Sequence, residues 1–334
     1  MSGGGTGRYL VTGGAGYVGG AVAARLLAAG HRVTVLDDLS TGFRAGVPEG
    51  ASLVEGRIQD AARWLDPSYD AVLHFAARSQ VAESVRDPEP YWRNNVGGTL
   101  DLLAAMRGAG VRRLVFSSTA AVYGEPAETP LTESAPTAPT SPYGASKLAV
   151  DHLLAGECRA HGLAATSLRY FNVAGAHRPE GGGPVLGERH DPESHLIPLV
   201  LQVALGQRES IAVYGDDYPT PDGSCVRDYI HVTDLAEAHL RALGAPEPGE
   251  HLVCNLGNGN GFSVREVIET ARRVTGHPLP ETAAPRRAGD PAVLIASSRR
   301  ARDRLGWRPR RAELADIIGD AWEFARATAS EAAR

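Results

Sequence analysis

Short runs of β-branched and aliphatic residues alternate with longer amphipathic stretches through the first half of the chain. The runs predict strands at residues 8–12, 31–38, 51–56, 71–77, 112–118 and 164–170. Helical patterns lie between several of them, as at 17–30 and 94–110, and both end at a glycine suited to a C-terminal cap. Strands that alternate with helices form parallel sheets covered on both faces. The pattern therefore predicts an α/β protein with a doubly wound parallel sheet.

The alternation ends near residue 176. A stretch rich in glycine, proline and charges follows at 177–195, and we interpret it as a surface loop. Beyond it, mixed with short strands, helices are predicted at 194–206, 232–243 and 263–276. We therefore expect a first domain over 1–175, rejoined by a segment near 224–245, and a second, smaller mixed α/β lobe over 176–223 and 246–334.

Charge and composition exclude two classes of partner. The 334 residues include 34 basic and 39 acidic side chains, with a formal net charge of −5 and no basic stripe. Neither nucleic acid nor a membrane surface is expected as a partner. No segment resembles a signal peptide or a membrane span, so a soluble, cytoplasmic protein is expected. Cys158, Cys225 and Cys254 form no C-x-x-C pair and predict neither disulfides nor a zinc site.

A glycine-rich turn, TGGAGYVGG at 12–20, links the first predicted strand to the first helix. Gly13, Gly16 and Gly19 have the spacing at which a tight turn brings the backbone close to a pyrophosphate, whose charge the helix N-terminus favours. The next strand ends at Asp37, at the distance expected for a carboxylate that binds the adenine-side ribose. Because this carboxylate would repel a 2′-phosphate, the pattern favours NAD over NADP.

A tyrosine and a lysine stand four residues apart in SPYGASKLAV at 141–150. On a helix, Tyr143 and Lys147 would share one face. A phenol becomes a usable base only when positive charge stabilises its phenolate, and a lysine supplies such a charge. The preceding strand ends in Ser117, Ser118 and Thr119, where a doubly wound sheet forms its ligand crevice. These residues predict a site for proton transfer beside a dinucleotide.

These motifs resemble those of the extended short-chain dehydrogenase/reductases and, within that superfamily, those of the UDP-glucose (UDP-galactose) 4-epimerases. In the family's order, over residues 8 to about 310, the matching segments are TGGAGYVGG, LDDLSTG, LHFAA, NNVGGT, FSSTAAVYG, PYGASK, LRYFNVAGA, VYGDDYPTPDGSCVRDYIHVTDLAEAH and RRAGDPA. The resemblance implies a Rossmann-type NAD-binding domain, a lobe that binds a UDP-sugar, and a homodimer.

The resemblance also implies roles for single residues. Tyr143 is the expected base, Lys147 its electrostatic partner, and Thr119 a hydroxyl that relays the proton. Contacts to NAD are expected from Gly13, Gly16, Tyr17, Val18, Gly19, Asp37, Asp38, Ser40, Ile58, Phe75, Ala76, Ala77, Asn95, Ser117, Tyr143, Lys147 and Tyr170. Contacts to the UDP-sugar are expected from Thr119, Tyr143, Asn172, His195, Leu196, Ala212, Tyr214, Arg227, Arg287, Asp290 and Leu294. Arginine suits a diphosphate because its planar fork pairs two oxygens at once.

The implied reaction interconverts UDP-glucose and UDP-galactose by transient oxidation at C4 and return of the hydride to the opposite face. A 4-epimerase of another nucleotide sugar, UDP-N-acetylglucosamine or a UDP-uronic acid, is the alternative. Leu294 matches a pocket position whose size controls the entry of N-acetyl sugars, and leucine is intermediate in size. A dehydratase fits less well, because Ala120 and Ala121 follow Thr119 where dehydratases carry an acidic pair. A non-catalytic NAD-binding protein would not need the tyrosine, the lysine and Thr119 in register.

Several positions depart from the family pattern. Arg57 replaces a usual aspartate near the adenine, and Ser79 replaces a common lysine, for which Arg78 next door is a candidate substitute. His195 occupies a position often filled by asparagine, and both a sugar contact and a hydrogen-bonding surface role are open. His190 and His195 lack the spacing typical of metal ligands, so no metal is expected.

Overall fold

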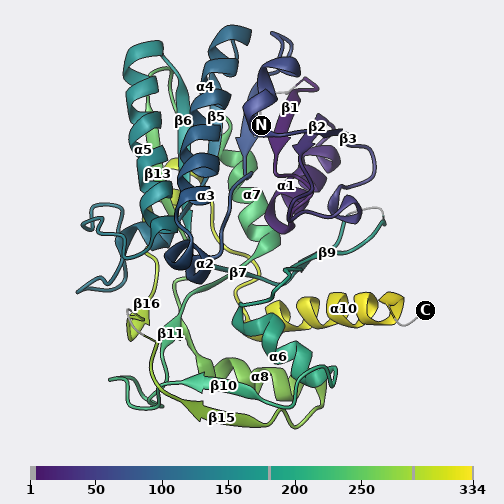
Figure 1. The fold of residues 1–334 in the computed structure, drawn as a ribbon, viewed down its shortest axis with the longest axis vertical. Helices are drawn as coiled ribbons and strands as arrows, with labels where there is room; N and C mark the ends of the chain where they lie inside the picture. Colours follow the sequence, from purple (N-terminus) through teal and green to yellow (C-terminus); the bar gives the residue numbers. More distant parts are fainter. Residues whose placement is uncertain (1–4, 180–181, 288–289, 333–334) are drawn as a thin grey trace.

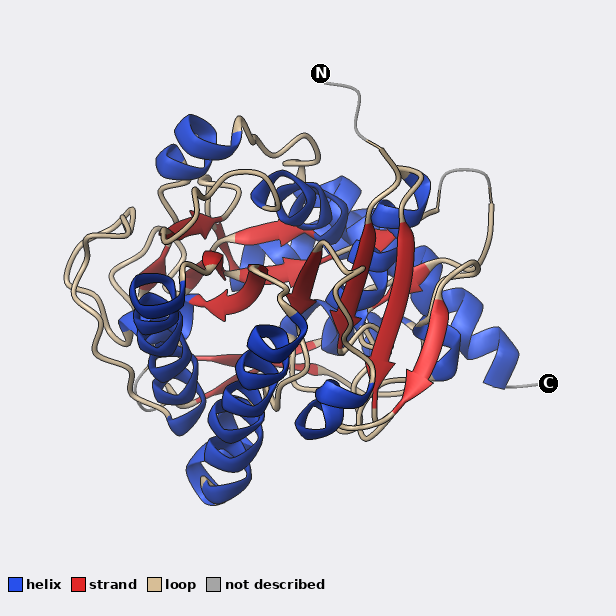
Figure 2. Ribbon diagram, turned by 90° about the horizontal axis from the view of Figure 1, so that it is seen from above, coloured by secondary structure: helices blue, strands red, loops and turns tan. Residues whose placement is uncertain are grey.

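The computed structural model describes residues 5–179, 182–287 and 290–332. A parallel seven-stranded sheet lies at the centre of its larger part, in the order β13-β6-β5-β4-β1-β2-β3 (Figure 1, Figure 2). The strands are β1 (Arg8–Thr12), β2 (Arg32–Asp37), β3 (Ser52–Glu55), β4 (Ala71–His74), β5 (Arg113–Thr119), β6 (Ala164–Tyr170) and β13 (His251–Leu256). All six strands predicted from the sequence are present in this sheet, and the doubly wound parallel fold is confirmed.

Helices cover both faces of the sheet, as Figure 2 shows. One face carries α1 (Tyr17–Ala28), α7 (Val232–Ala242) and α9 (Arg299–Leu305), and the other carries α4 (Gly98–Ala109) and α5 (Pro142–His161). Successive strand residues divide between the two cores, as the pleat requires: Val11 packs toward α1 and α7, and Leu10 toward α4 and α5. Burial on both faces explains why these strands are continuous apolar runs in the sequence.

Capping residues in the sequence mark the start of α5 and the ends of α4 and α5. α5 starts with Pro142 after Ser141, whose hydroxyl accepts a hydrogen bond from the backbone N–H of Gly144 (3.2 Å). α4 and α5 end at Gly110 and Gly162, both in the left-handed conformation with φ of 73° and 70°. Glycine adopts this conformation without steric cost, so the sequence sets where both helices stop.

The second lobe is smaller and mixed, as predicted, and lies below the large sheet in Figure 1. Its elements are α6 (Leu196–Ala204), α8 (Val264–Thr275), α10 (Leu314–Ala332), β10 (Ile211–Tyr214), β11 (Val226–Arg227), β14 (Phe262–Ser263), β15 (Glu281–Ala284) and β16 (Val293–Leu294). β10 and β15 form a parallel pair, and β14-β11-β16 form a three-stranded sheet. The three helices share one core, with Ile197, Ile268 and Ile317 fully or almost fully buried in it.

Short elements connect the two parts. α2 (Val81–Arg86) and α3 (Glu89–Tyr91) follow β4, β7 (Asn172–Ala174) pairs with β12 (Tyr229–His231), and β8 (Ala176–His177) pairs with β9 (Leu186–Gly187). β9 and His177 of β8 lie inside the stretch predicted as a loop, which therefore forms part of a short antiparallel ladder. None of the helices in the described ranges has the length and apolar character needed to span a bilayer.

β13 corrects the sequence-based division of the chain. It lies within 246–334, the stretch assigned to the second lobe, yet it pairs with β6 as an edge strand of the large sheet. Leu252, Cys254 and Leu256 alternate along it and are buried in the same core as α7 and α9. The second lobe is thus built from two stretches of the chain, one between β6 and β13 and one after β13.

Candidate active site

A cavity of about 1930 Å³ opens where the order of the large sheet reverses, between β1 and β4. In doubly wound sheets this point, at the carboxyl ends of the strands, is where ligands bind. The residues expected from the sequence that line it are Gly13, Gly16, Tyr17, Val18, Gly19, Asp37, Asp38, Ser40, Ile58, Phe75, Ala76, Ala77, Ser117, Thr119, Tyr143, Lys147, Tyr170, Asn172, His195, Leu196, Ala212, Tyr214, Arg227, Arg287, Asp290 and Leu294. Asn95 alone among the expected residues does not line it.

The glycine turn fits a dinucleotide because side chains are sterically excluded from it. Gly13 has φ of 73°, and a Cβ there would lie 2.5 Å from the backbone nitrogen of Ala76, which follows β4. A Cβ on Gly19 would lie 2.3 Å from the carbonyl oxygen of Gly13. Gly16 is the N-cap of α1 and has no side chain to cover the first-turn N–H groups. This bare helix N-terminus can receive a pyrophosphate.

Asp37 lies at the end of β2 with 8% of its surface exposed. Its Oδ2 accepts a hydrogen bond from the backbone N–H of Ala15 (3.0 Å), and its Oδ1 from that of Leu39 (2.9 Å). Burial raises the pKa of Asp37, and the two backbone hydrogen bonds oppose that rise. The carboxylate is therefore tied to the glycine turn and faces the cavity, where it can accept hydrogen bonds from a ribose.

Tyr143 and Thr119 meet at the end of β5. Burial raises the pKa of the Tyr143 phenol, and the nearby Thr119 side chain opposes that rise. Ser117, two residues earlier on β5, is hydrogen-bonded through Oγ to the hydroxyl of Tyr170. Two tyrosines from α5 and β6 thus meet two hydroxyls of one strand, in a site that can pass a proton between oxygens.

Lys147 is almost fully buried one turn after Tyr143 on α5. Its Nζ donates a hydrogen bond to the carbonyl oxygen of Ser117 (2.8 Å) and lies 4.8 Å from the ring centroid of Phe116. Burial lowers the pKa of Lys147 to about 7, and the carboxylate of Asp151 opposes that shift. Lys147 is thus held at the carboxyl end of the sheet, one helical turn after Tyr143.

Asp151, whose charge acts on Lys147, belongs to a buried ion pair. Oδ2 of Asp151 accepts hydrogen bonds from Nε (3.0 Å) and Nη2 (2.8 Å) of Arg169 on β6. The Asp151 side chain is 4% exposed and that of Arg169 is 8% exposed. Arg169 also donates to the hydroxyl of Tyr123 (3.1 Å), which donates to Oδ1 of Asn255 on β13 (2.7 Å). The spacing of these residues along the chain gives no sign of this network.

Asn95 has a structural role in the described geometry. It lies in a π-helical turn, Trp92–Gly97, and is 2% exposed. Its side-chain nitrogen donates to the carbonyl oxygen of Arg78 (3.0 Å) and to Oγ of Ser146 (3.0 Å), and its Oδ1 accepts from the N–H of Arg78 (2.9 Å). Asn95 therefore fixes the cavity-lining loop after β4 rather than lining the cavity itself. Its neighbour Asn94 does line the cavity, and sequence reasoning missed it.

The opposite wall of the cavity comes from the second lobe. Arg227 on β11 forms an ion pair with Asp290, and its side chain is 11% exposed. The guanidinium of Arg287 lies 4.0 Å from the ring centroid of Tyr214 on β10. Two arginines thus face the cavity in fixed orientations, one held by a carboxylate and one by an aromatic ring. Such arginines can bind a diphosphate.

Four more expected residues line the cavity. Leu196 is the first residue of α6, Ala212 lies on β10 and Leu294 on β16. Asn172 starts β7 and is paired with Tyr229 of β12. Each of the three apolar side chains comes from a different element, so the sheet order and the helix packing of the second lobe bring them together.

The positions that depart from the family pattern also border the cavity. Arg57, Arg78 and Ser79 line it. Arg78 pairs with Glu83 (3.3 Å) through a side chain that is 43% exposed. Cationic side chains are therefore available near the expected adenine and near the loop after β4, although neither departure restores the usual residue.

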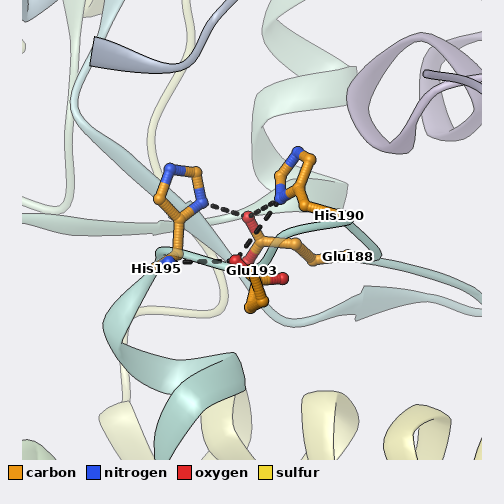
Figure 3. Close-up of side chains that lie close together, drawn as sticks. All are labelled: Glu188, His190, Glu193 and His195. Carbon is orange, nitrogen blue, oxygen red and sulfur yellow. Dashed lines mark hydrogen bonds and ion pairs between the residues drawn. The ribbon is translucent and has the colours of Figure 1, made fainter. Parts of the chain in front are cut away.

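His195 precedes α6 and belongs to a compact group with Glu188, His190 and Glu193 (Figure 3). Its Nδ1 is hydrogen-bonded to Oε1 of Glu188. Desolvation disfavours the charged imidazolium, yet attraction to Glu188, the hydrogen bond and the charge of Glu193 raise the pKa of His195 to about 9. The histidine is therefore held by carboxylates at the rim of the cavity. Sequence reasoning identified the two histidines but missed both glutamates.

Comparisons with known proteins agree with this geometry. The model of the NAD dependent epimerase/dehydratase family matches residues 9–257. A UDP-glucose 4-epimerase of Streptomyces lividans is 68% identical, with 96% of each chain covered. The crystal structure of UDP-glucose 4-epimerase from Bifidobacterium longum in complex with NAD+ and UDP is 36% identical, covers 96% of this chain and 99% of that one, and has a TM-score of 0.87. The UDP-Glc/GlcNAc 4-epimerase of Campylobacter jejuni is 37% identical, with 96% and 99% covered and a TM-score of 0.83. The chain thus belongs to the NAD dependent epimerase/dehydratase family and, within it, to the UDP-glucose 4-epimerases.

Proposed function

We propose that this protein interconverts UDP-glucose and UDP-galactose, with Tyr143 as the group that takes and returns the proton of the sugar 4-hydroxyl. The observation that carries the proposal is that the Tyr143 side chain, the Thr119 hydroxyl and the buried Lys147 line the same part of the large cavity. A glycine turn borders this cavity on one side and two arginines border it on the other. Nucleotide and sugar can therefore meet at the tyrosine.

The first domain would hold NAD. The bare N-terminus of α1 would bind its pyrophosphate, and Asp37 would accept hydrogen bonds from its adenine-side ribose. Bound NAD supplies the hydride acceptor and donor for C4 of the sugar. Lys147 contributes a positive charge near the phenol, and this charge favours the phenolate when the proton of the sugar moves to Tyr143.

The second lobe would hold the UDP-sugar. Arg227 and Arg287 would pair with the diphosphate, and Leu196, Ala212 and Tyr214 would enclose the uridine. Because these contacts are made to the nucleotide, the hexose is left free to present either face of C4 to the cofactor. A firm nucleotide anchor and a loosely held sugar are what an epimerase requires. Thr119 lines the cavity with Tyr143 and would relay the proton when the sugar 4-hydroxyl does not reach Tyr143 directly.

We also propose a homodimer and a cytoplasmic location. The exposed face of α4 includes Leu100, which is 47% exposed, and Trp92 just before it is 43% exposed. Large apolar side chains on an exposed helix face favour association. Sedimentation at micromolar concentration tests the dimer, and a monomer alone would contradict it.

The test of the reaction uses the purified full chain and UDP-galactose, followed at C4 by NMR. Wild type should form UDP-glucose, and Tyr143→Phe should slow it by about 10²–10⁴-fold, the usual contribution of a positioned acid–base group. Tyr69→Phe is a matched control, because Tyr69 is a buried tyrosine of the first domain that does not line the cavity. Equal rates for Tyr143→Phe and wild type would rule out the assigned role.

A further inference from the structure

Four side chains of the segment between β9 and α6 converge at one point. Glu188, His190, Glu193 and His195 each offer one ligand atom, and these four atoms lie within 4.8 Å of one another. Figure 3 shows both imidazole rings with a nitrogen directed at the two carboxylates. Nothing in the reaction proposed above uses this arrangement of two carboxylates and two imidazoles.

The carboxylates of the group are buried to an unusual degree. The side chains of Glu188 and Glu193 are 7% and 6% exposed, whereas that of His190 is 23% exposed. Glutamates are almost never buried so far unless a cation or several donors compensate them. Arg189, the nearest arginine in sequence, does not supply the compensating charge, because its guanidinium lies over the ring of Phe43, 4.3 Å from the ring centroid. His195 pairs with Glu188, and the backbone N–H groups of Ser194 (2.7 Å) and His195 (2.9 Å) donate to Oε1 of Glu193. These partners compensate the carboxylates in part, and a cation at the centre would complete the compensation.

His190 points to what would fill that centre. Its Nδ1 is buried and lies 3.5 Å from Oε1 of Glu188 and 3.5 Å from Oε1 of Glu193, yet it makes no hydrogen bond within the described part of the chain. A tetrahedral ion with bonds of about 2.0–2.2 Å holds its ligand atoms about 3.4 Å apart. The spacing from His190 to both carboxylates is thus close to that of ligands around one ion.

We propose that Glu188, His190, Glu193 and His195 bind one divalent transition-metal ion of the Zn²⁺ or Co²⁺ type. Imidazole ligands favour these ions over Mg²⁺ and Ca²⁺, which prefer oxygen. Four protein ligands leave no open position, so the ion is structural rather than catalytic. His195 and Glu188 are in direct hydrogen-bond contact, and their ligand atoms would have to separate to about 3.4 Å to share one ion.

The ion would stabilise one wall of the cavity. α6 begins at Leu196, directly after the ligand His195, and β9 ends at Gly187, directly before the ligand Glu188. Ser194, between the ligands, donates from Oγ to Oε1 of Gln80 on the loop after β4 (2.9 Å). A metal here would join the start of α6 to β9 and so fix the segment that spans the two lobes.

The experiment titrates the full chain, prepared without a histidine tag and freed of metal by chelation, with Zn²⁺ in a calorimeter. One equivalent should bind to the wild type. In His190→Gln and Glu193→Gln the affinity should fall more than about 100-fold, since loss of an outer-shell partner alone costs about 10–100-fold. His277→Gln removes an exposed imidazole of the second lobe outside the group and should bind as the wild type does.

A spectrum of the wild type keeps the test decisive even if a variant unfolds. Co²⁺ added to the metal-free wild type should give the intense visible absorption of a tetrahedral centre, saturating at one equivalent. Only the weak absorption of hydrated Co²⁺, or Zn²⁺ binding that is equal in wild type, His190→Gln and Glu193→Gln, would overturn the proposal.

Discussion

Asp151→Asn tests whether the buried ion pair between Asp151 and Arg169 stabilises the folded protein. The substitution keeps the shape of the side chain and removes its charge. Arg169 would then keep its positive charge in a site where its side chain is 8% exposed. Breaking a buried pair by removing one partner costs about 3–5 kcal/mol of the free energy of unfolding. We expect a loss of this size, because one carboxylate oxygen accepts both guanidinium bonds.

The assay is urea denaturation of the cofactor-loaded protein, followed by circular dichroism. Glu89→Gln is the control, since Glu89 pairs with Arg93 in an ion pair whose side chains are 69% and 80% exposed. Its effect should stay within about 0.5 kcal/mol. A double variant, Asp151→Leu with Arg169→Met, should recover most of the loss, because apolar residues replace a buried pair without leaving a lone charge. If Asp151→Asn costs no more than Glu89→Gln, the pair does not carry the stability assigned to it.

Three further outcomes can be measured. Gly19→Ala should reduce NAD affinity, measured by fluorescence titration, at least tenfold, or about 1.4 kcal/mol, because the new Cβ would lie 2.3 Å from a backbone oxygen. Gly108→Ala is the control, since the space around its Cβ is open, and it should leave NAD affinity unchanged in the same titration. His74 has a pKa of about 3, lowered by burial and by Lys147, and therefore favours the folded state above pH 6.5. Its contribution disappears as the pH falls from 6.5 toward 3, at about 1.4 kcal/mol per pH unit, and thermal melts of His74→Asn should show a shallower decline. Leu294→Ala should raise the ratio of kcat/KM for UDP-N-acetylgalactosamine to kcat/KM for UDP-galactose about tenfold or more, and Leu294→Tyr should lower it. If neither variant changes this ratio, the size of residue 294 does not control the entry of N-acetyl sugars.

Local patterns in the sequence were sufficient for much of the fold. Apolar runs bounded by turns predicted the strands from β1 to β6, and Ser141 with Pro142 marks the start of α5. The glycine turn was predictable because its restriction is local: Gly13 requires a positive φ and a close neighbour. The expected NAD and UDP-sugar contacts rested on the resemblance, and nearly all of those residues line one cavity.

The features that the sequence did not reveal depend on contacts between distant residues. The hydroxyl of Tyr123 donates a hydrogen bond to Asn255, 132 positions later in the chain. Hydrophobic periodicity does not predict contacts between residues so far apart in sequence. β13 was misassigned because second-lobe segments come before and after it in the chain, while its partner, β6, is distant in sequence. The group around His190 was missed for a different reason. Its carboxylates stand in a charged, proline-containing stretch that reads as solvated loop, and only the fold shows that they are buried.

The place of β13 in the sheet has a consequence for synthesis of the chain. Until residues 251–256 leave the ribosome, β6 has no neighbouring strand on one side. Its backbone N–H and C=O groups on that side are then unpaired, although the strand is apolar and is buried in the folded protein. The whole intervening stretch, 171–250, must be made before that edge is closed, so a late, long-range contact completes the first domain. A fragment ending at residue 175 should therefore aggregate, and the NAD-binding half of this protein cannot be separated by cutting the chain once.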